Sequence, residues 1–282
     1  MAETIKFSNW LQELAASSNH PFMRDSEKMI QYFFELENKL PSTYDWRYTS
    51  SETFKKQSEV VKKATSDRAF DELNILYWHD MVRNIEAYGL MTYWRAAEQF
   101  KSAVKLLDER DVLAPAVVSR SLLELGATVI VNSNNIRDTV KAALMNVAPI
   151  ITSKELEELI VCLIWGTKVN GFSGYPRPID SRKYREFISK NPNASEFPDV
   201  YKFLCGLTHP DMLGNARFWA SDVTENEDGS ITLRIERQAE SALTTEIREK
   251  VLWALGWSAV CVRNGVEINQ DAVATILKRW PK

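Results

Sequence analysis

Residues 116–131, Ala-Val-Val-Ser-Arg-Ser-Leu-Leu-Glu-Leu-Gly-Ala-Thr-Val-Ile-Val, decide the fold of this chain. The stretch is apolar on nearly every side, and a helix of that kind belongs at the centre of a fold. Pro115 precedes it and suits the first turn of a helix. Arg120 and Glu124 interrupt the apolar run four residues apart, so they lie on one helical face. An unpaired buried charge is strongly destabilising. Each of the two therefore needs a partner, either the other or a polar group from across the core.

A second stretch, residues 201–220, supplies polar groups of that kind. Tyr201, Cys205, Thr208 and His209 follow one another at helical spacing and therefore share one face of a helix. His209 stands before a proline, which pushes its backbone out of the helical region. We therefore expect His209 at the end of a helix whose polar face is not purely a packing surface.

Working outward from these stretches, hydrophobic periodicity predicts helices over most of the chain. They are expected at 3–18, 25–40, 67–110 with a break near Tyr88-Gly89, 115–131, from a turn at 132–135 to 147, 153–166, 197–209, 244–264 with Gly265 as a stop signal, and 270–280. Strands are expected only at 216–223 and 231–236, joined by a turn at 225–229. The fold class predicted is all-α, a multi-helix bundle-like domain with one late β-hairpin at about 216–236.

The division into domains rests on a change of composition. Residues 42–66 are polar, and the region before them carries two short helical patterns. This predicts an N-terminal helical layer at 1–66 and a main helical domain at 67–282. A single domain spanning 1–282 is the alternative, because this length fits one large domain as well as two small ones.

Composition excludes several classes of protein. The net charge is −3, without the basic excess typical of proteins that hold long duplex DNA. Cys162, Cys205 and Cys261 lie in apolar runs without a CxxC pair, which favours free thiols in a reducing compartment. The N-terminus has no apolar signal core, and no strictly apolar run approaches the ~20 residues that span a bilayer. We expect a cytoplasmic protein without membrane contact.

The sharpest candidate site combines Arg120, Glu124, Tyr201 and His209. If the two helices meet, Glu124 can orient His209, Arg120 can hold an anion, and His209 can act as a general acid or base near neutral pH. The alternative is a satisfied polar cluster that fixes the register of two core helices. A metal site built from His209, Asp211 and Glu124 is not expected, because the three histidines are far apart in the chain.

A second candidate is the segment 168–190, which carries six Lys or Arg residues against two acidic ones. Aromatic residues alternate with these basic residues, a pattern that suits single-stranded RNA or a nucleotide through stacking and phosphate contacts. The substrate-binding residues predicted there are Lys168, Tyr175, Arg177, Arg182 and Lys183. An ordinary solvated loop is the alternative. The chain has neither a phosphate loop nor a GxGxxG sequence, and no cofactor is expected.

Two short motifs carry a resemblance. Arg120-Ser-Leu-Leu-Glu124, followed some eighty residues later by Tyr201-x-x-x-Cys205-x-x-x-His209-Pro210, resembles an uncharacterised family of bacterial helical proteins. That family recurs near mobile elements and phage-defence genes and is distantly similar to the HEPN helical bundles, many of which are ribonucleases or toxin partners. The HEPN ribonuclease signature is an arginine, then four to six residues, then a histidine. This chain has no such pair, so Arg120 would have to meet His209 through the fold.

The resemblance implies an effector of a phage-defence or toxin-type system that acts on RNA or a nucleotide, as a ribonuclease or a nucleotide-processing enzyme. The alternative function is a non-enzymatic helical interaction or scaffold protein of a larger complex or homodimer. The partners expected are an RNA or nucleotide ligand and a protein partner or second copy, without a cofactor or a metal.

Overall fold

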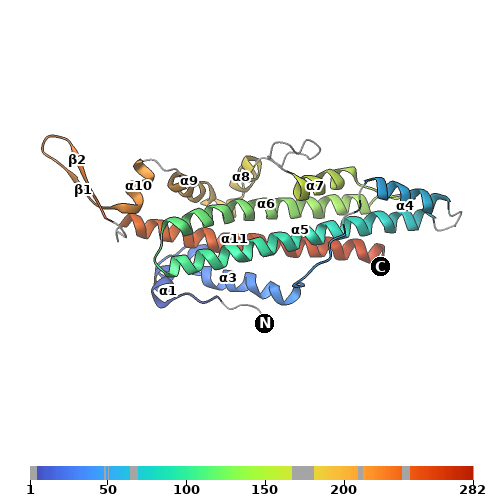
Figure 1. Ribbon diagram of the computed structural model, residues 1–282, viewed down its shortest axis with the longest axis horizontal. Coiled ribbons are helices and arrows are strands. Elements are labelled where there is room, and N and C mark those ends of the chain that lie inside the picture. Colours follow the sequence, from blue (N-terminus) through green and yellow to red (C-terminus); the bar gives the residue numbers. More distant parts are fainter. Residues whose placement is uncertain are drawn as a thin grey trace. The chain divides into compact units, whose positions relative to one another are not determined.

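The computed structural model describes residues 5–47, 49, 51–63, 69–166, 181–208, 212–236 and 242–281. Helices dominate these ranges, and their only sheet is a two-stranded antiparallel hairpin late in the chain (Figure 1). The all-α class with one late β-hairpin is therefore confirmed.

The elements follow one another in this order: α1 (Asn9–Ala16), α2 (Pro21–Arg24), α3 (Ser26–Phe34), η1 (Glu35–Lys39), α4 (Ser51–Lys63), α5 (Ala69–Asp108), α6 (Leu113–Leu144), α7 (Lys154–Trp165), α8 (Ser181–Ser189), η2 (Pro192–Ala194), α9 (Phe197–Thr208), α10 (Met212–Trp219), β1 (Ala220–Glu225), β2 (Ile231–Ile235) and α11 (Ala242–Arg279).

The chain forms two compact units, each built from three separate segments. Unit 1 contains Met1–Lys39, Trp94–Thr128 and Tyr184–Arg263, and unit 2 contains Leu40–Tyr93, Val129–Lys183 and Asn264–Lys282. One boundary follows Lys39, and the others fall inside α5, α6, α8 and α11, so each of these four helices contributes one part to each unit. The region 1–66, expected as one layer, is divided between the units at residue 39.

Unit 1 is held together by aromatic side chains from helices distant in sequence. Phe33 of α3 and Phe100 of α5 are fully buried, with ring centroids 4.9 Å apart. Phe197 of α9 lies 4.8 Å from Trp257 of α11. A Cβ placed on Gly126 of α6 would lie only 3.1 Å from the Trp257 ring, so α6 and α11 approach closely here because this position has no side chain.

Unit 2 has its own core around Trp78 of α5. The Trp78 ring is fully buried and stacks on Trp280, with centroids 5.2 Å apart and ring planes 9° from parallel. Its indole N–H donates to the carbonyl of Ile151 at 2.9 Å. Ile85, Ile136 and other apolar residues of α5, α6, α7 and α11 complete this core.

The three long helices continue through the positions where breaks were expected, so those expectations were wrong. In α6, Asn132 and Ser133 are fully buried, and Asn134 donates from its side chain to the carbonyl of Ile130 at 2.7 Å. Polar side chains there bond within the helix and pack instead of forming a turn. In α11, a Cβ on Gly265 would collide with Val129 of α6 and lie 3.2 Å from Ser133 Oγ. Gly265 therefore permits close helix packing and does not end the helix.

The turn of the hairpin lies where it was expected, but the first strand begins later in the chain than predicted. Val223 pairs with Leu233 and Glu225 with Ile231, around a turn in which Gly229 adopts a φ of 78°. Glycine suits that conformation because it has no Cβ. The first part of the strand expected at 216–223 belongs to α10 instead.

By length and composition, α6 could cross a membrane. Its most apolar window has a mean hydropathy of 1.4, and half of that window is buried inside the structure. A buried core helix of a soluble protein has the same character, and Arg120 and Glu124 lie in this helix.

Candidate functional site

The structure brings together four side chains from α6 and α9 in unit 1. Arg120 and Glu124 come from α6, and Tyr201 and Cys205 come from the facing side of α9. Each pair is separated by four residues, so each helix presents its two side chains on one face. Together with Arg185 of α8, described below, they form what we call the Tyr201 cluster.

Hydrogen bonds connect these four side chains. The Tyr201 hydroxyl donates to Glu124 Oε1 at 2.5 Å, and Arg120 Nη2 donates to the same oxygen at 3.3 Å. Arg120 Nε lies 3.1 Å from Cys205 Sγ, which accepts from it. One carboxylate oxygen thus accepts hydrogen bonds from both the phenol and the guanidinium. This shared acceptor holds α6 and α9 in a single register.

A second guanidinium reaches the same ring. Arg185 Cζ lies 4.4 Å from the centroid of Tyr201, and Arg120 Cζ lies 5.8 Å from it. Phe197 stacks on the Tyr201 ring with planes 17° from parallel. Two cations and one carboxylate therefore surround one aromatic ring, which leaves the cluster with an excess of positive charge.

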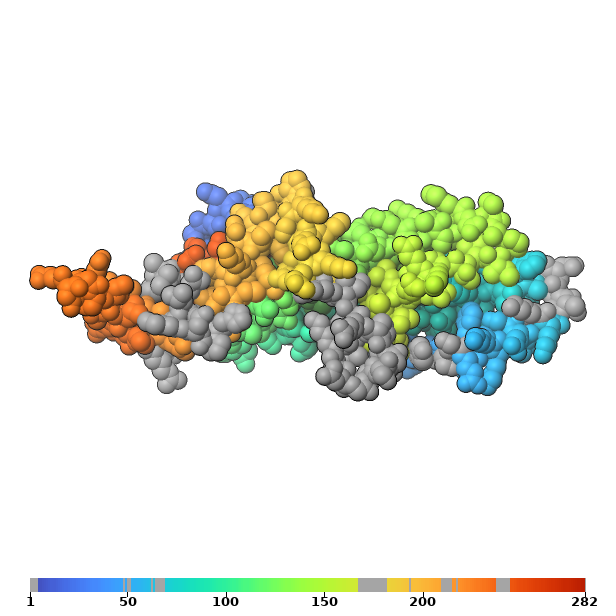
Figure 2. Space-filling model, turned by 90° about the horizontal axis from the view of Figure 1, so that it is seen from above, coloured from blue at the N-terminus to red at the C-terminus, as the bar shows by residue number. Residues whose placement is uncertain are grey.

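The charged ends of the cluster reach solvent, whereas its ring is buried. The side chains of Arg120 and Glu124 are 35% and 32% exposed, and Tyr201 is 7% exposed. Figure 2 shows α8 and α9, coloured gold to orange, at the surface of the molecule. A ligand can therefore reach the guanidinium groups without opening the core of unit 1.

The surroundings change the proton affinity of two members. Burial alone lowers the pKa of Arg120, but its hydrogen bonds to Cys205 and Tyr201 and the charge of Glu124 outweigh this, so the pKa is raised. Burial, and then the hydrogen bond to Glu124, raises the pKa of the Tyr201 phenol above its ordinary value. At neutral pH, Arg120 is therefore a cation and Tyr201 a neutral hydrogen-bond donor.

Three tyrosines should make the protein sensitive to alkali. Burial is the largest cause that raises the pKa of Tyr44, Tyr77 and Tyr201 above the ordinary value of 10.0. A phenol with a raised folded pKa stabilises the protein below pH 10 and loses that contribution as the pH rises through the folded pKa. We expect the free energy of unfolding to fall above pH 10, by at most about 1.4 kcal/mol per pH unit for each tyrosine.

Denaturant titrations between pH 9 and 12 measure this fall, and phenolate absorbance at 295 nm follows the ionisation. Tyr201→Phe should remove part of the late-titrating absorbance and make the fall less steep. Ionisation of all tyrosines in a single step near pH 10, without loss of stability, would contradict the expectation.

The structure describes five of the nine site residues proposed from the sequence. Arg120, Glu124 and Tyr201 meet as expected. Arg182 and Lys183 lie exposed on α8. The remaining four, His209, Lys168, Tyr175 and Arg177, lie outside the described residues.

Arg185 is the member of the cluster that the sequence argument missed. It was counted among the basic residues of 168–190 but was not singled out. Its signal is its position on α8, where it follows Arg182 by three residues and lies between the buried side chains of Tyr184 and Ile188. A basic residue flanked by buried ones on a short helix is held close to the core, where its guanidinium can reach an aromatic ring.

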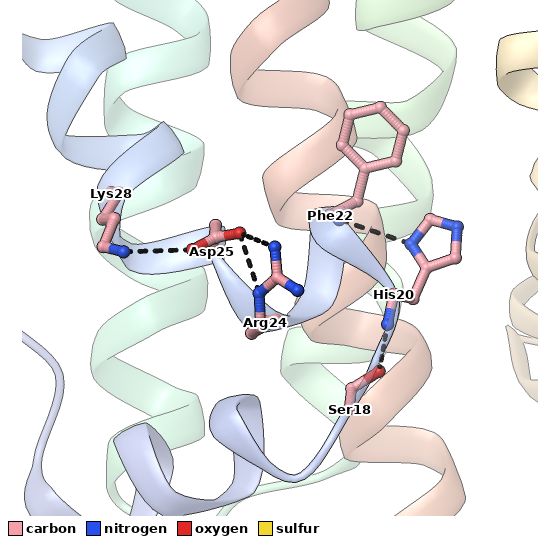
Figure 3. A network of polar contacts seen from close by, with 6 residues as sticks. All are labelled: Ser18, His20, Phe22, Arg24, Asp25 and Lys28. Carbon is pink, nitrogen blue, oxygen red and sulfur yellow. Dashed lines mark hydrogen bonds and ion pairs between the residues drawn. The ribbon is translucent and has the colours of Figure 1, made fainter.

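The two described histidines have structural partners. His20 Nδ1 accepts the backbone N–H of Phe22 at 3.3 Å, and the His20 backbone N–H donates to Ser18 Oγ at 3.1 Å (Figure 3). His20 Nε2 accepts from the indole N–H of Trp253 at 3.4 Å and lies 3.1 Å from Glu196 Oε1. In unit 2, His79 Nε2 lies 3.0 Å from the carbonyl of Trp280. Both imidazoles are used in packing and capping.

Possible metal ligands are not clustered in the described part of the chain, and its cysteines are free. No group of three or more His, Cys, Asp or Glu side chains able to hold a metal ion occurs there. The described cysteines are free thiols. Burial raises the pKa of the Cys261 thiol, so it stays protonated and is a poor nucleophile.

No family model matches this chain, and no match was found among curated proteins or solved structures. The case for a function therefore rests on the residues of the Tyr201 cluster and on the resemblance of the two motifs.

Proposed function

We propose that the Tyr201 cluster binds the phosphate of single-stranded RNA or of a nucleotide, and that the protein is a HEPN-like effector of a bacterial phage-defence or toxin-type system. One observation carries the binding proposal. Guanidinium groups from two helices, Arg120 of α6 and Arg185 of α8, lie against the same Tyr201 ring. Arginine is well suited to phosphate, because its planar fork can donate two parallel hydrogen bonds.

The surroundings of the cluster favour a ligand that combines phosphate with a base. Phe187 on α8 is 62% exposed, and an exposed ring is a surface on which a base can stack. Arg182 and Lys183, which precede Arg185 on the same helix, are also basic. The buried Tyr201 ring has a different role, which is to hold the two guanidinium groups in place.

Glu124 and His209 have two further roles in the proposed function. Glu124 binds Arg120 and Tyr201 through one oxygen and so fixes the anion-binding group. His209 immediately follows Thr208, the last residue of α9, and we assign it the acid–base role because imidazole can exchange a proton near neutral pH.

The test measures the affinity of a fluorescein-labelled single-stranded oligouridylate for the full chain by fluorescence anisotropy. Arg185→Gln should weaken binding by about tenfold or more, because a charge-assisted hydrogen bond to phosphate is lost. Glu124→Gln should strengthen it by about threefold, because it removes a negative charge close to the bound phosphate. The control is Lys28→Gln on α3, where the lysine side chain is 84% exposed and pairs with Asp25 (Figure 3).

Comparison of the variants separates binding at a specific site from general electrostatic attraction between the protein and RNA. Lys28→Gln and Arg185→Gln change the charge equally, so equal losses of affinity would show that only net charge matters. Equal affinities for the wild type, Arg185→Gln and Glu124→Gln would contradict binding at this cluster.

One observation favours the alternative of a non-enzymatic interaction protein. Val223, Ile231 and Ile235 of the hairpin are 58%, 67% and 70% exposed, and the pairing register places them on one face. An exposed apolar face of this kind is typical of protein contacts. This alternative predicts that the Arg185 and Glu124 variants behave alike towards RNA.

A further inference from the structure

Unit 2 contains a pocket that the proposed function does not use. It has a volume of about 310 Å³ and lies between α4, α5 and α7. This volume is at the lower end of the range for small-molecule sites. Its lining is mostly apolar and includes the aromatic rings of Phe54, Tyr77 and Trp165.

The walls of the pocket are held in place by neighbouring side chains. Trp46 packs on Trp165 with ring centroids 5.5 Å apart, and its indole N–H donates to Asn84 Oδ1 at 3.1 Å. The Tyr77 hydroxyl bonds to the backbone N–H and carbonyl of Ser153, each at 3.0 Å. A ligand would therefore meet aromatic surfaces that are already oriented, which lowers the entropic cost of binding.

Asp80 and Asn84 provide buried polar groups in the lining. Both are more than nine-tenths buried, at 8% and 7% exposed. Asp80 Oδ1 accepts from Arg83 Nη2 at 2.7 Å, a short bond, whereas Oδ2 accepts from Asn84 Nδ2 at 3.3 Å, a long one. Oδ2 therefore has the greater capacity to accept a further hydrogen bond from a donor inside the pocket.

The charges of the lining select the sign of the ligand. Asp80 and Glu157 are acidic, and Lys55 is an exposed basic residue. Arg83 neutralises part of the charge of Asp80 from outside the lining. An anion entering the pocket would meet Lys55 and two carboxylates, whereas an ammonium group would meet two carboxylates and aromatic rings, which attract cations.

We propose that this pocket binds a small organic amine with an aromatic body. The ammonium group would donate to Asp80 Oδ2, with Glu157 as the second carboxylate, and the body would lie against Trp165, Tyr77 and Phe54. The site is independent of the Tyr201 cluster, which lies in the other unit.

The test is isothermal titration calorimetry of the full chain with phenethylamine and with 3-phenylpropionate, which share an aromatic body and differ in the sign of their charge. Phenethylamine should bind about tenfold or more tightly than 3-phenylpropionate. Asp80→Asn should weaken phenethylamine binding by about tenfold, and Glu157→Gln by about threefold. The control is Glu158→Gln, the same change one residue further along α7, where the side chain is 68% exposed and is not part of the lining.

Glu157→Gln keeps the test decisive even if Asp80→Asn fails to fold after losing its ion pair with Arg83. Absence of phenethylamine binding, equal affinity for both compounds, or equal losses in Glu157→Gln and Glu158→Gln would each overturn the proposal. Weaker binding in Glu157→Gln alone would support it.

Discussion

Replacing Gly256 by alanine is expected to lower the free energy of unfolding by about 3 kcal/mol, and the melting temperature by on the order of 10 °C. Gly256 lies in α11, and a Cβ at this position would overlap the carbonyl oxygen of Phe22 and lie 3.0 Å from its carbonyl carbon. Both atoms belong to the backbone of α2, which cannot rotate away as the end of a flexible side chain could. The helices must therefore separate, and packing in unit 1 is lost.

Gly89→Ala is the matched control, because it makes the same change inside another long helix. A Cβ at Gly89 would lie 3.8 Å from Asn269 Nδ2, an ordinary van der Waals distance. Alanine favours the helix, so this variant should be more stable by about 0.5–1 kcal/mol. Thermal and denaturant unfolding of both variants measure the two effects. A destabilisation of equal size in both would show that close approach of α2 and α11 is not the cause.

His209→Gln should lower the rate of RNA cleavage by roughly 100-fold or more if the proposed acid–base role is correct. Single-turnover cleavage of a labelled single-stranded RNA measures the rate, and the melting temperature should stay close to that of the wild type. His79→Gln is the matched control. Since His79 bonds to the carbonyl of Trp280, its replacement should cost about 1 kcal/mol of stability and leave cleavage unchanged.

Three outcomes would count against the role of His209. A melting temperature lowered by several degrees in His209→Gln would favour a structural histidine. Equal cleavage by the wild type and His209→Gln would exclude it as the acid–base group. Absence of RNA cleavage by the wild-type protein would contradict the proposed catalytic function. The anisotropy measurements would still decide whether the Tyr201 cluster binds RNA.

Much of the fold could be predicted because the governing signals are local. Hydrophobic periodicity indicated a helix at 153–166, and α7 lies there, with Ser153 as its N-cap accepting from the backbone N–H of Leu156. The alternation of Ile231 and Leu233 likewise identified β2. Such features depend on a few neighbouring residues and are visible in the sequence.

The continuity of the long helices could not be predicted in this way. Asn132 and Gly265 have the residue types of a turn and a helix stop, yet both lie inside helices. What decides their role is the neighbouring helix, which buries Asn132 and leaves no space for a side chain at Gly265. Local propensity was overridden by packing between residues more than one hundred positions apart in the chain.

The candidate site could likewise be predicted only in part from the sequence. The requirement that Arg120 and Glu124 find partners, and the polar face of the helix with Tyr201, together predicted a meeting that the structure contains. The approach of Arg185 to the Tyr201 ring depends on where α8 packs. A sequence pattern shows that α8 is amphipathic, but it does not show which ring lies beneath it.

The long helices restrict how this gene can change in length. Since α5, α6 and α11 each contribute to both units, insertion or deletion of a single residue near the boundary would turn every later position of that helix by about 100°. In α11, such a change after Arg263 would move Gly265 away from Val129. Homologues should therefore tolerate insertions and deletions in the hairpin turn at Glu225–Gly229 far more readily than within these three helices.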